Sequence, residues 1–401
     1  MRSEQRRLLV ALGVTQITAW GSVYYLMSPL MTHLQRDLGL SKDSVVGAFS
    51  LALLVSGVLA PVVGRAIDRY GGRLIMAVGA VGCGAGLLWL SRADGLVSLY
   101  GAWLVLGVSM AATLYDPAFA VLARVFGADL RRAITVLTLF GGFASTVFWP
   151  LTQALIDSFG WRDAVAILAL LNTALCVPLH IWAQRGMPAS SSEPIAAVAG
   201  RPSHPARDSA VRRALRTPAF YLLCVAFMAN ALAFSAMSVH LLPMLVDKGL
   251  TPLQAAAIGA LAGPMQVLGR VVEMAVGSRY KALHVGLVAM AMLPLSLLLF
   301  AGLGTAMAPY WVFAFLYGAG NGIVTIVRGA IPIEVFGQAG YGAINGAMAA
   351  PVLLAKAGGP LIAAMLWGAM GGYAPMAVVL AAIAALSIAF VVPLLTLSRN
   401  V

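Results

Sequence analysis

Four ionisable side chains lie deep inside long apolar stretches of this sequence. Asp116 falls in the stretch MAATLYDPAFAVLARVFG, and Arg270, Arg328 and Lys356 fall in three apolar stretches of the second half. A charge in apolar surroundings is costly unless it faces a partner or a wet cavity. Arginine binds a carboxylate through two parallel hydrogen bonds, and lysine supplies a compact positive charge. Three cations with few carboxylates at the same depth therefore indicate a binding site for an anion.

The segments that carry these charges have the composition of membrane helices. The chain is 61% hydrophobic and only 10% charged, whereas a soluble domain has roughly 25% charged residues. Segments of about 20 apolar residues, long enough to cross roughly 30 Å of hydrocarbon, recur throughout. Backbone amides in lipid must be satisfied within the segment, which favours helices over strands. We predict an all-α polytopic membrane protein with twelve transmembrane helices. The spans are expected at approximately residues 8–30, 44–66, 73–91, 96–124, 133–157, 163–183, 218–246, 253–277, 283–304, 308–334, 341–367 and 372–397.

Arginine and lysine residues gather on one side of the predicted spans. The first apolar segment is too long for a signal-peptide core, so we count it as a helix. With the N-terminus inside, the outer loops hold only Arg36, Lys42, Arg92, Arg162 and Lys248. Because cytoplasmic loops are rich in these cations, we expect a multi-pass protein of the cell (inner) membrane with both termini in the cytoplasm. The same distribution accounts for the net charge of +12 without a nucleic-acid partner.

One polar segment divides the chain into halves. It is rich in Pro, Ser and Arg, which indicates a cytoplasmic linker. We predict an N-terminal six-helix bundle at 1–183, a linker at 184–217 and a C-terminal six-helix bundle at 218–401.

The two halves also resemble each other in sequence. VVGRAID after the second span aligns with VLGRVVE after the eighth at an offset of 205 residues, which pairs Gly64 with Gly269. At an offset of 210, the Val-Phe-Gly that begins at Val125 aligns with the one that begins at Val335. Ordered matches of this kind indicate a duplicated six-helix unit, which is typical of secondary transporters.

The segment GRAIDRYGGR carries a family resemblance. It resembles the G-x-x-x-D-R-x-G-x-R loop between helices 2 and 3 of the major facilitator superfamily, and the twelve-span layout covers essentially the whole chain. The resemblance implies a gate that favours the outward-facing state, formed by Gly64, Asp68, Arg69, Gly71 and Arg73. We expect Gly64 to let two helices approach closely, and Asp68 to bond an exposed helix N-terminus and a loop arginine. The alternative is a solvated charged turn.

Three further features resemble the monocarboxylate transporter and oxalate-formate exchanger group. RRAITVLTLFGG is similar to that group's basic pair before a glycine-containing helix 5. AWGSVYYL in the first span is similar to its tryptophan-glycine signature, but lacks the acidic residue and the second tryptophan. The exchangers carry an arginine on helix 8 and a lysine in an Ala-Lys segment of helix 11. This implies that Arg270 and Lys356 hold the substrate carboxylates, although the repeat mate Arg65 leaves open a place for Arg270 at the cytoplasmic rim.

Asp116 lies roughly two turns from Arg124 in the fourth span, and three roles are open for it. The resemblance implies that spans 4 and 10 face the central cavity, so Asp116 and Arg328 could form a gate between the halves. Alternatively, Asp116 carries a coupling proton, because an approaching arginine changes the proton affinity of a carboxylate. The third alternative is a packing role with a bond to backbone near Pro117.

Other polar and aromatic residues within the spans are weaker candidates. Tyr24 and Tyr25 are candidates to line the pocket and bond a carboxylate, with helix packing as the alternative. Asn230 and Asn321 are expected to form interhelical hydrogen bonds, and His240 to lie at the membrane interface. The cysteines have no metal-ligand spacing and are expected to be buried apolar residues: Cys83, Cys176 and Cys224.

Functional motifs of enzymes are missing from the sequence. There is no G-x-S-x-G elbow, no His-Glu-x-x-His and no nucleotide-binding signature, so we expect no enzyme activity, cofactor or metal. We predict a secondary active transporter, functional as a monomer in the lipid bilayer. It would move a small organic anion, a mono- or dicarboxylate, by alternating access with proton symport or exchange for a counter-anion.

Two other functions remain open. A proton-driven exporter of amphiphilic compounds is disfavoured by the cationic site and by the missing glycine-proline signature of the fifth span. A membrane sensor built on the same fold is the alternative outside transport, and a flux assay separates it from a transporter.

Overall fold

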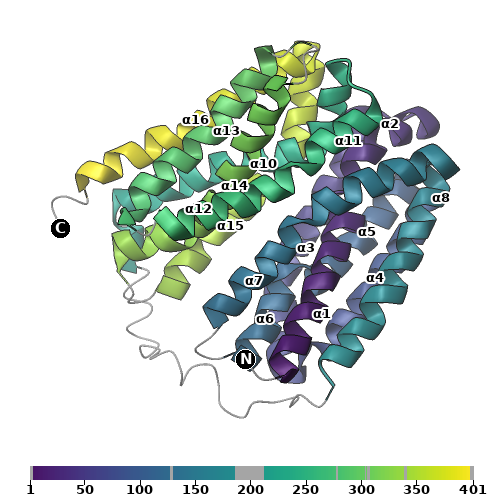
Figure 1. The fold of residues 1–401 in the computed structure, drawn as a ribbon, viewed down its shortest axis with the longest axis horizontal. Helices are drawn as coiled ribbons and strands as arrows, with labels where there is room; N and C mark the ends of the chain where they lie inside the picture. The colour runs from purple at the N-terminus through teal and green to yellow at the C-terminus, as the bar shows by residue number, and fades with distance from the viewer. Residues whose placement is uncertain are drawn as a thin grey trace. The chain divides into compact units, whose positions relative to one another are not determined.

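The computed structural model describes residues 3–126, 130–185, 212–276, 279–302, 304, 308–337 and 341–397 (Figure 1). All regular elements in these ranges are helices. Those before the linker are α1 (Ser3–Ala19), η1 (Trp20–Tyr24), α2 (Met27–Leu38), α3 (Lys42–Tyr70), α4 (Gly72–Ser91), α5 (Leu96–Thr113), α6 (Tyr115–Phe126), α7 (Leu130–Gly142) and α8 (Ala144–Ala183). Those after it are α10 (Pro218–Asp247), α11 (Pro252–Ala260), α12 (Ala262–Val276), α13 (Ala282–Gly302), α14 (Ala308–Phe336), α15 (Tyr341–Met370) and α16 (Tyr373–Leu397).

Helical stretches long and apolar enough to cross a membrane number 11 among the described residues. One of them, Arg132–Ala183, has 52 residues and would be about 78 Å long as a single helix, far more than one crossing needs. Gly160 interrupts it with φ at +78°, between the predicted fifth and sixth spans. Counted as two crossings, this stretch completes the predicted twelve, and the all-α membrane fold is confirmed.

By their internal contacts, the residues group into two compact units. Unit 1 is Met1–Ala199 with Pro252–Ala260, and unit 2 is Gly200–Thr251 with Leu261–Val401. In unit 1, α4 packs against α5 and α8, and α1 packs against α7 and α8 (Figure 1). In unit 2, α10 packs against α15 and α16, and α13 against α14 and α16. Each unit thus buries its own apolar core.

Both units contain the same close helix contact. A Cβ atom added to Gly107 of α5 would lie 2.7 Å from the carbonyl oxygen of Ala52 on α3. One added to Gly318 of α14 would lie 2.6 Å from the carbonyl oxygen of Ala262 on α12. Gly318 follows Gly107 by 211 residues and Ala262 follows Ala52 by 210, which is within one residue of the offset of 210 found in the sequence. Only glycine allows these helices to approach so closely. In each half, a glycine of the fourth span therefore packs against the backbone of the second span.

Candidate functional site

Span 4 is broken next to Asp116. α5 ends at Thr113 and α6 begins at Tyr115, because Pro117 has no N–H to bond the carbonyl of Thr113 one turn earlier. Gln16 of α1, which is fully buried, donates its amide to that carbonyl at 2.7 Å and to the carbonyl of Leu114 at 3.4 Å. The side chain therefore replaces the missing helical bond in a region where water is unavailable.

A polar chain continues from Gln16 into the π-helical turn η1 of the first span. Trp20, the first residue of this turn, donates its indole N–H to Oε1 of Gln16 at 3.1 Å. Ser22 donates to the carbonyl of Thr18 at 2.7 Å and accepts a bond from Asn172 of α8 at 2.8 Å. Single π-helical turns are frequent at functional sites because they redirect the side chains of a helix. Here the turn ties spans 1, 4 and 6 together beside Asp116.

Three aromatic rings form a surface next to Asp116, which we call the aromatic shelf: Trp20, Tyr115 and Phe119. The centroids of the Trp20 and Tyr115 rings are 4.9 Å apart, and Tyr115 stacks on Phe119 at 5.2 Å with an interplanar angle of 9°. All three residues are half-buried, whereas Asp116 is exposed. Because residues three apart share a helix face, Asp116 and Phe119 lie on the same side of α6.

The two candidate tyrosines lie in different surroundings. Tyr24 is only 3% exposed, and its ring is 4.8 Å from the ring of Trp20 and 5.5 Å from that of Phe49. Tyr25 is half-buried, and its carbonyl accepts a 2.9 Å bond from the indole of Trp149. The structure therefore leaves part of Tyr25 accessible to a ligand, while Tyr24 packs within unit 1.

The three candidate cations lie on separate helices of unit 2. Lys356 occupies the middle of the 30-residue helix α15 and is half-buried. Its carbonyl accepts a 2.6 Å bond from Ser235 of α10, which fixes this part of α15 against its neighbour. Arg270 of α12 is 5% exposed and lies six residues, or about 9 Å, from the end of its helix. Arg328 of α14 is exposed and lies about 12 Å from the end of its helix.

A polar pair lies one turn from Arg270. Asn321 of α14 donates to Oε1 of Gln266 on α12 at 3.1 Å, so the interhelical bond predicted for Asn321 is confirmed. Gln266 did not stand out in the sequence, although its spacing of four residues from Arg270 places both on one helix face. His240 is fully buried, with Nε2 3.0 Å from the carbonyl oxygen of Pro360. This bond to α15 satisfies a ring nitrogen inside the helix pair, and the interfacial position of His240 stays a prediction.

The loop between α3 and α4 turns at Gly71. Its φ of +81° is in a region open mainly to glycine, and its N–H donates to the carbonyl of Ile67 at 2.8 Å. Arg124 of α6 donates to the same carbonyl at 2.8 Å. A Cβ on Gly72 would lie 2.9 Å from Oε1 of Gln184 and would also overlap Val121. The loop is therefore held by backbone geometry and by the end of span 4.

The other loop candidates contribute less to this turn. A Cβ on Gly64 would meet no atom within 4 Å, so unit 1 does not make the close helix approach that we expected at this residue. The tight approach occurs at Gly72 instead. Arg69 lies over the ring of Tyr70 at 5.1 Å, Arg73 is half-buried, and the side chain of Asp68 lies outside the described residues.

Arg124 has a counterpart of opposite charge in unit 2. Glu334 of α14, 210 residues further on, accepts a 3.3 Å bond at Oε2 from the backbone N–H of Leu283, near the start of α13. Arg124 therefore meets the negative end of a helix and Glu334 the positive end. The bond that holds Glu334 is thus made to backbone. In the sequence, the repeat offset of 210 residues is the signal that relates Arg124 to Glu334.

A family model for the Major Facilitator Superfamily matches residues 12–360. The chain belongs to the major facilitator superfamily. Human (Homo sapiens) monocarboxylate transporter 11 is 30% identical over 267 residues, which are 61% of this chain and 53% of that protein. The chain spans about half the length of the curated relatives it matches.

Solved structures show the same fold at low sequence identity. The nucleoside transporter NupG has a TM-score of 0.76 at 14% identity, with 97% of this chain and 98% of that chain covered. A bacterial homologue of the human lysosomal transporter Spinster has a TM-score of 0.72 at 15% identity, with 100% and 96% covered. These relatives and neighbours are membrane transporters, and this chain is a multi-pass membrane protein of the same superfamily.

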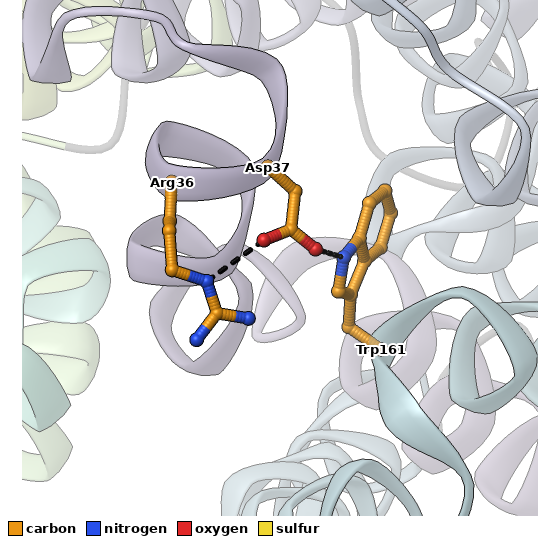
Figure 2. Close-up of polar contacts among 3 residues, drawn as sticks. All are labelled: Arg36, Asp37 and Trp161. Atoms are coloured by element: carbon orange, nitrogen blue, oxygen red, sulfur yellow. Dashed lines mark hydrogen bonds and ion pairs between the residues drawn. The ribbon is translucent and has the colours of Figure 1, made fainter.

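Unit 1 of this superfamily protein also has a polar clamp at the end of α2 (Figure 2). Asp37 accepts a 2.6 Å bond at Oδ2 from the indole N–H of Trp161, and its Oδ1 pairs with Nε of Arg36 at 2.8 Å. Arg162 donates to the carbonyl of Ser91 at 3.0 Å. Because Trp161 directly follows the turn at Gly160, the clamp ties this turn to the ends of α2 and α4. The sequence marked Arg36 and Arg162 only as loop cations and did not single out Asp37 or Trp161.

Proposed function

We propose that this transporter is a secondary active carrier of a small organic anion, a mono- or dicarboxylate. The observation that supports the proposal is the charge of unit 2 at span depth. Residues 212–397 contain only three acidic side chains, Asp247, Glu273 and Glu334, and each lies within about one turn of a helix end. Arg270, Arg328 and Lys356 are further inside their helices. An excess of positive charge at this depth favours an anionic ligand.

In this proposal each cation makes a different kind of contact with the anion. Lys356 supplies a point charge from the middle of α15, and Arg270 and Arg328 supply planar guanidinium groups that match a carboxylate. Tyr25 adds a hydroxyl from the first span, and Tyr24 supports its position. The names of the monocarboxylate transporters among the relatives are in keeping with a carboxylate substrate.

The same proposal assigns the remaining candidates to conformational change. The loop residues Gly64, Asp68, Arg69, Gly71 and Arg73 form a gate that alternates with transport. Asp116 acts either in a gate with Arg328 or as a proton carrier, which correspond to exchange and to proton symport. We place the protein in the inner membrane as a monomer with cytoplasmic termini, and assign the bundles to 1–183 and 218–401 with a linker at 184–217.

The test uses purified protein in liposomes with radiolabelled oxalate, formate, lactate and pyruvate. Each substrate is offered once with an imposed pH gradient and once against unlabelled internal substrate. Uptake that follows the pH gradient supports proton symport, whereas uptake that needs only internal substrate supports exchange. Failure to transport any carboxylate in both arms would overturn the proposal.

The variants Lys356→Gln and Arg270→Gln test the site itself. We expect each to lower carboxylate uptake by about tenfold or more, because removing one partner of a charge-assisted pair typically costs about 2 kcal/mol or more. Lys281→Gln is the matched control, because this exposed lysine lies just before α13 and outside the proposed site. Full activity in both site variants would remove these cations from the site.

A further inference from the structure

We propose that unit 1 binds the headgroup of an anionic phospholipid between the start of α1 and the end of α8. The residues of this surface, which we call the headgroup site, are Arg6, Arg7, Trp182 and Arg185. The inference goes beyond the proposed function, because the ligand is a component of the membrane and does not depend on which substrate is carried.

The first step is the contact that brings these residues together. Nη2 of Arg7 donates to the carbonyl of Arg185 at 3.0 Å, so the start of α1 lies against the end of α8 (Figure 1). The guanidinium carbon of Arg7 is 5.5 Å from the centroid of the Trp182 ring, which is within the range of a cation–π contact. Two segments 178 residues apart in sequence thus form one surface.

The second step is the depth of this surface in the membrane. Arg6 and Arg7 directly precede the first predicted span, and Arg185 follows the sixth. Trp182 is 51% exposed, as expected of a tryptophan at the level of the lipid headgroups. Val10 is 50% exposed and lies one turn from Arg6 on the same face of α1. The surface therefore changes from apolar to cationic where a phospholipid changes from acyl chain to phosphate.

The third step is the unmatched positive charge. Arg7 bonds the end of α8, which is the negative end of that helix, but its Nε is buried and meets no acceptor among the described residues. The side chains of Arg6 and Arg185 are exposed and form no hydrogen bond or ion pair with the part of the chain that the structure describes. Glu4, the acidic residue in the first turn of α1, forms no ion pair with these three arginines. One arginine is enough to cap α8, so the other two are available to an anion.

The fourth step is the choice of a lipid as the anion. Arginine binds phosphate oxygens through parallel hydrogen bonds, and cations beside a membrane span attract anionic lipids. The exposed side chains of Trp182 and Val10 offer apolar contact to acyl chains, which a soluble anion lacks. Phosphatidylglycerol combines a negatively charged phosphodiester with acyl chains and is therefore the probe that we select.

The first experiment measures lipid binding to the purified full-length chain in detergent by native mass spectrometry. We expect the wild type to bind phosphatidylglycerol more tightly than phosphatidylcholine with the same acyl chains. In Arg6→Gln/Arg185→Gln, the affinity for the tightest phosphatidylglycerol should fall about tenfold or more, because two cations are lost from the surface. Arg7 keeps its bond to the carbonyl of residue 185 in this variant, so the contact between the helices is retained.

Arg279→Gln/Lys281→Gln is the matched control. It removes the same charge from two exposed residues just before α13, outside the headgroup site, and should bind phosphatidylglycerol like the wild type. Equal losses of affinity in the two double variants would overturn the inference, because the attraction would then follow net charge alone. Equal affinity of the wild type for the two lipids would overturn it as well.

The second experiment locates the lipid by fluorescence. Bromine atoms on acyl chains quench nearby tryptophans, so brominated phosphatidylglycerol should quench the wild type more than brominated phosphatidylcholine does. Trp182→Phe should lose most of this difference, whereas Trp89→Phe should keep it; Trp89 is 46% exposed near the end of α4. A difference that persists in Trp182→Phe would place the lipid elsewhere and overturn the inference. Displacement of the lipid by inorganic phosphate would show a site for a soluble anion instead.

Discussion

At the scale of single residues, Gln16 stabilises the break in the helix of span 4. Its buried amide bonds the carbonyl of Thr113, which Pro117 leaves without its regular helical donor, and also contacts the carbonyl of Leu114. We predict that Gln16→Leu lowers the free energy of unfolding by about 1–3 kcal/mol, because a buried carbonyl loses its donor. Thermal unfolding of the purified protein in detergent, followed by tryptophan fluorescence, measures the change.

Gln35→Leu is the control for this substitution. Gln35 is half-buried at the end of α2, so the same change of side chain there should leave the midpoint of unfolding nearly constant. Equal shifts in the two variants would show that the bond from Gln16 does not stabilise the broken helix.

The residues of the site were predictable to different degrees. The depth of Lys356 follows from its place in an apolar run, because hydropathy locates the middle of a span. The role of Gln16 does not follow, because its partner is set by a proline about 100 residues later. The burial of Tyr24 could not be predicted from the sequence either. Both faces of the first span are apolar, so hydrophobic periodicity does not show which tyrosine ring is buried.

At the scale of the helices, the fourth span of each half is tied to the loop that follows its second span. We predict that Arg124→Glu destabilises the protein more than Arg124→Gln, because a negative charge then meets the negative end of α3. In the same way, Glu334→Arg should destabilise it more than Glu334→Gln at the positive end of α13. Each charge reversal should cost about 1 kcal/mol relative to the neutral variant.

The neutral glutamine variants separate charge from side-chain length. Thermal unfolding at low and at high salt provides the measurement, because screening should reduce the difference between the reversed and the neutral variant. A reversal that is as stable as its glutamine variant at low salt would contradict the helix-end explanation at that position.

The helices themselves follow from the sequence more closely than their irregularities do. Twelve apolar runs predict twelve crossings, and the turn at Gly160 falls between the fifth and sixth of them. The π-helical turn at Trp20–Tyr24 was not predictable, because hydropathy averages over many residues and carries no signal for one additional residue per turn. The repeat offset was visible in the sequence, but the glycine contacts that share it required coordinates.

At the scale of the whole molecule, the distribution of arginine and lysine predicts how the chain lies in the membrane. All three cysteines are buried, with exposures of 0% for Cys83, 2% for Cys176 and 7% for Cys224. The wild-type chain should therefore react slowly with maleimides, since thiol reactivity requires access. This low background makes single introduced cysteines suitable reporters of sidedness.

We predict that Asp94→Cys is labelled by a membrane-impermeant maleimide on intact cells, and that Tyr280→Cys is labelled only after the cells are permeabilised. Asp94 is an exposed residue in the loop after α4, and Tyr280 is 65% exposed just before α13. With cytoplasmic termini, an odd number of crossings precedes the first position and an even number precedes the second. Labelling of Tyr280→Cys alone on intact cells would reverse the orientation, and labelling of both would contradict the span count between them.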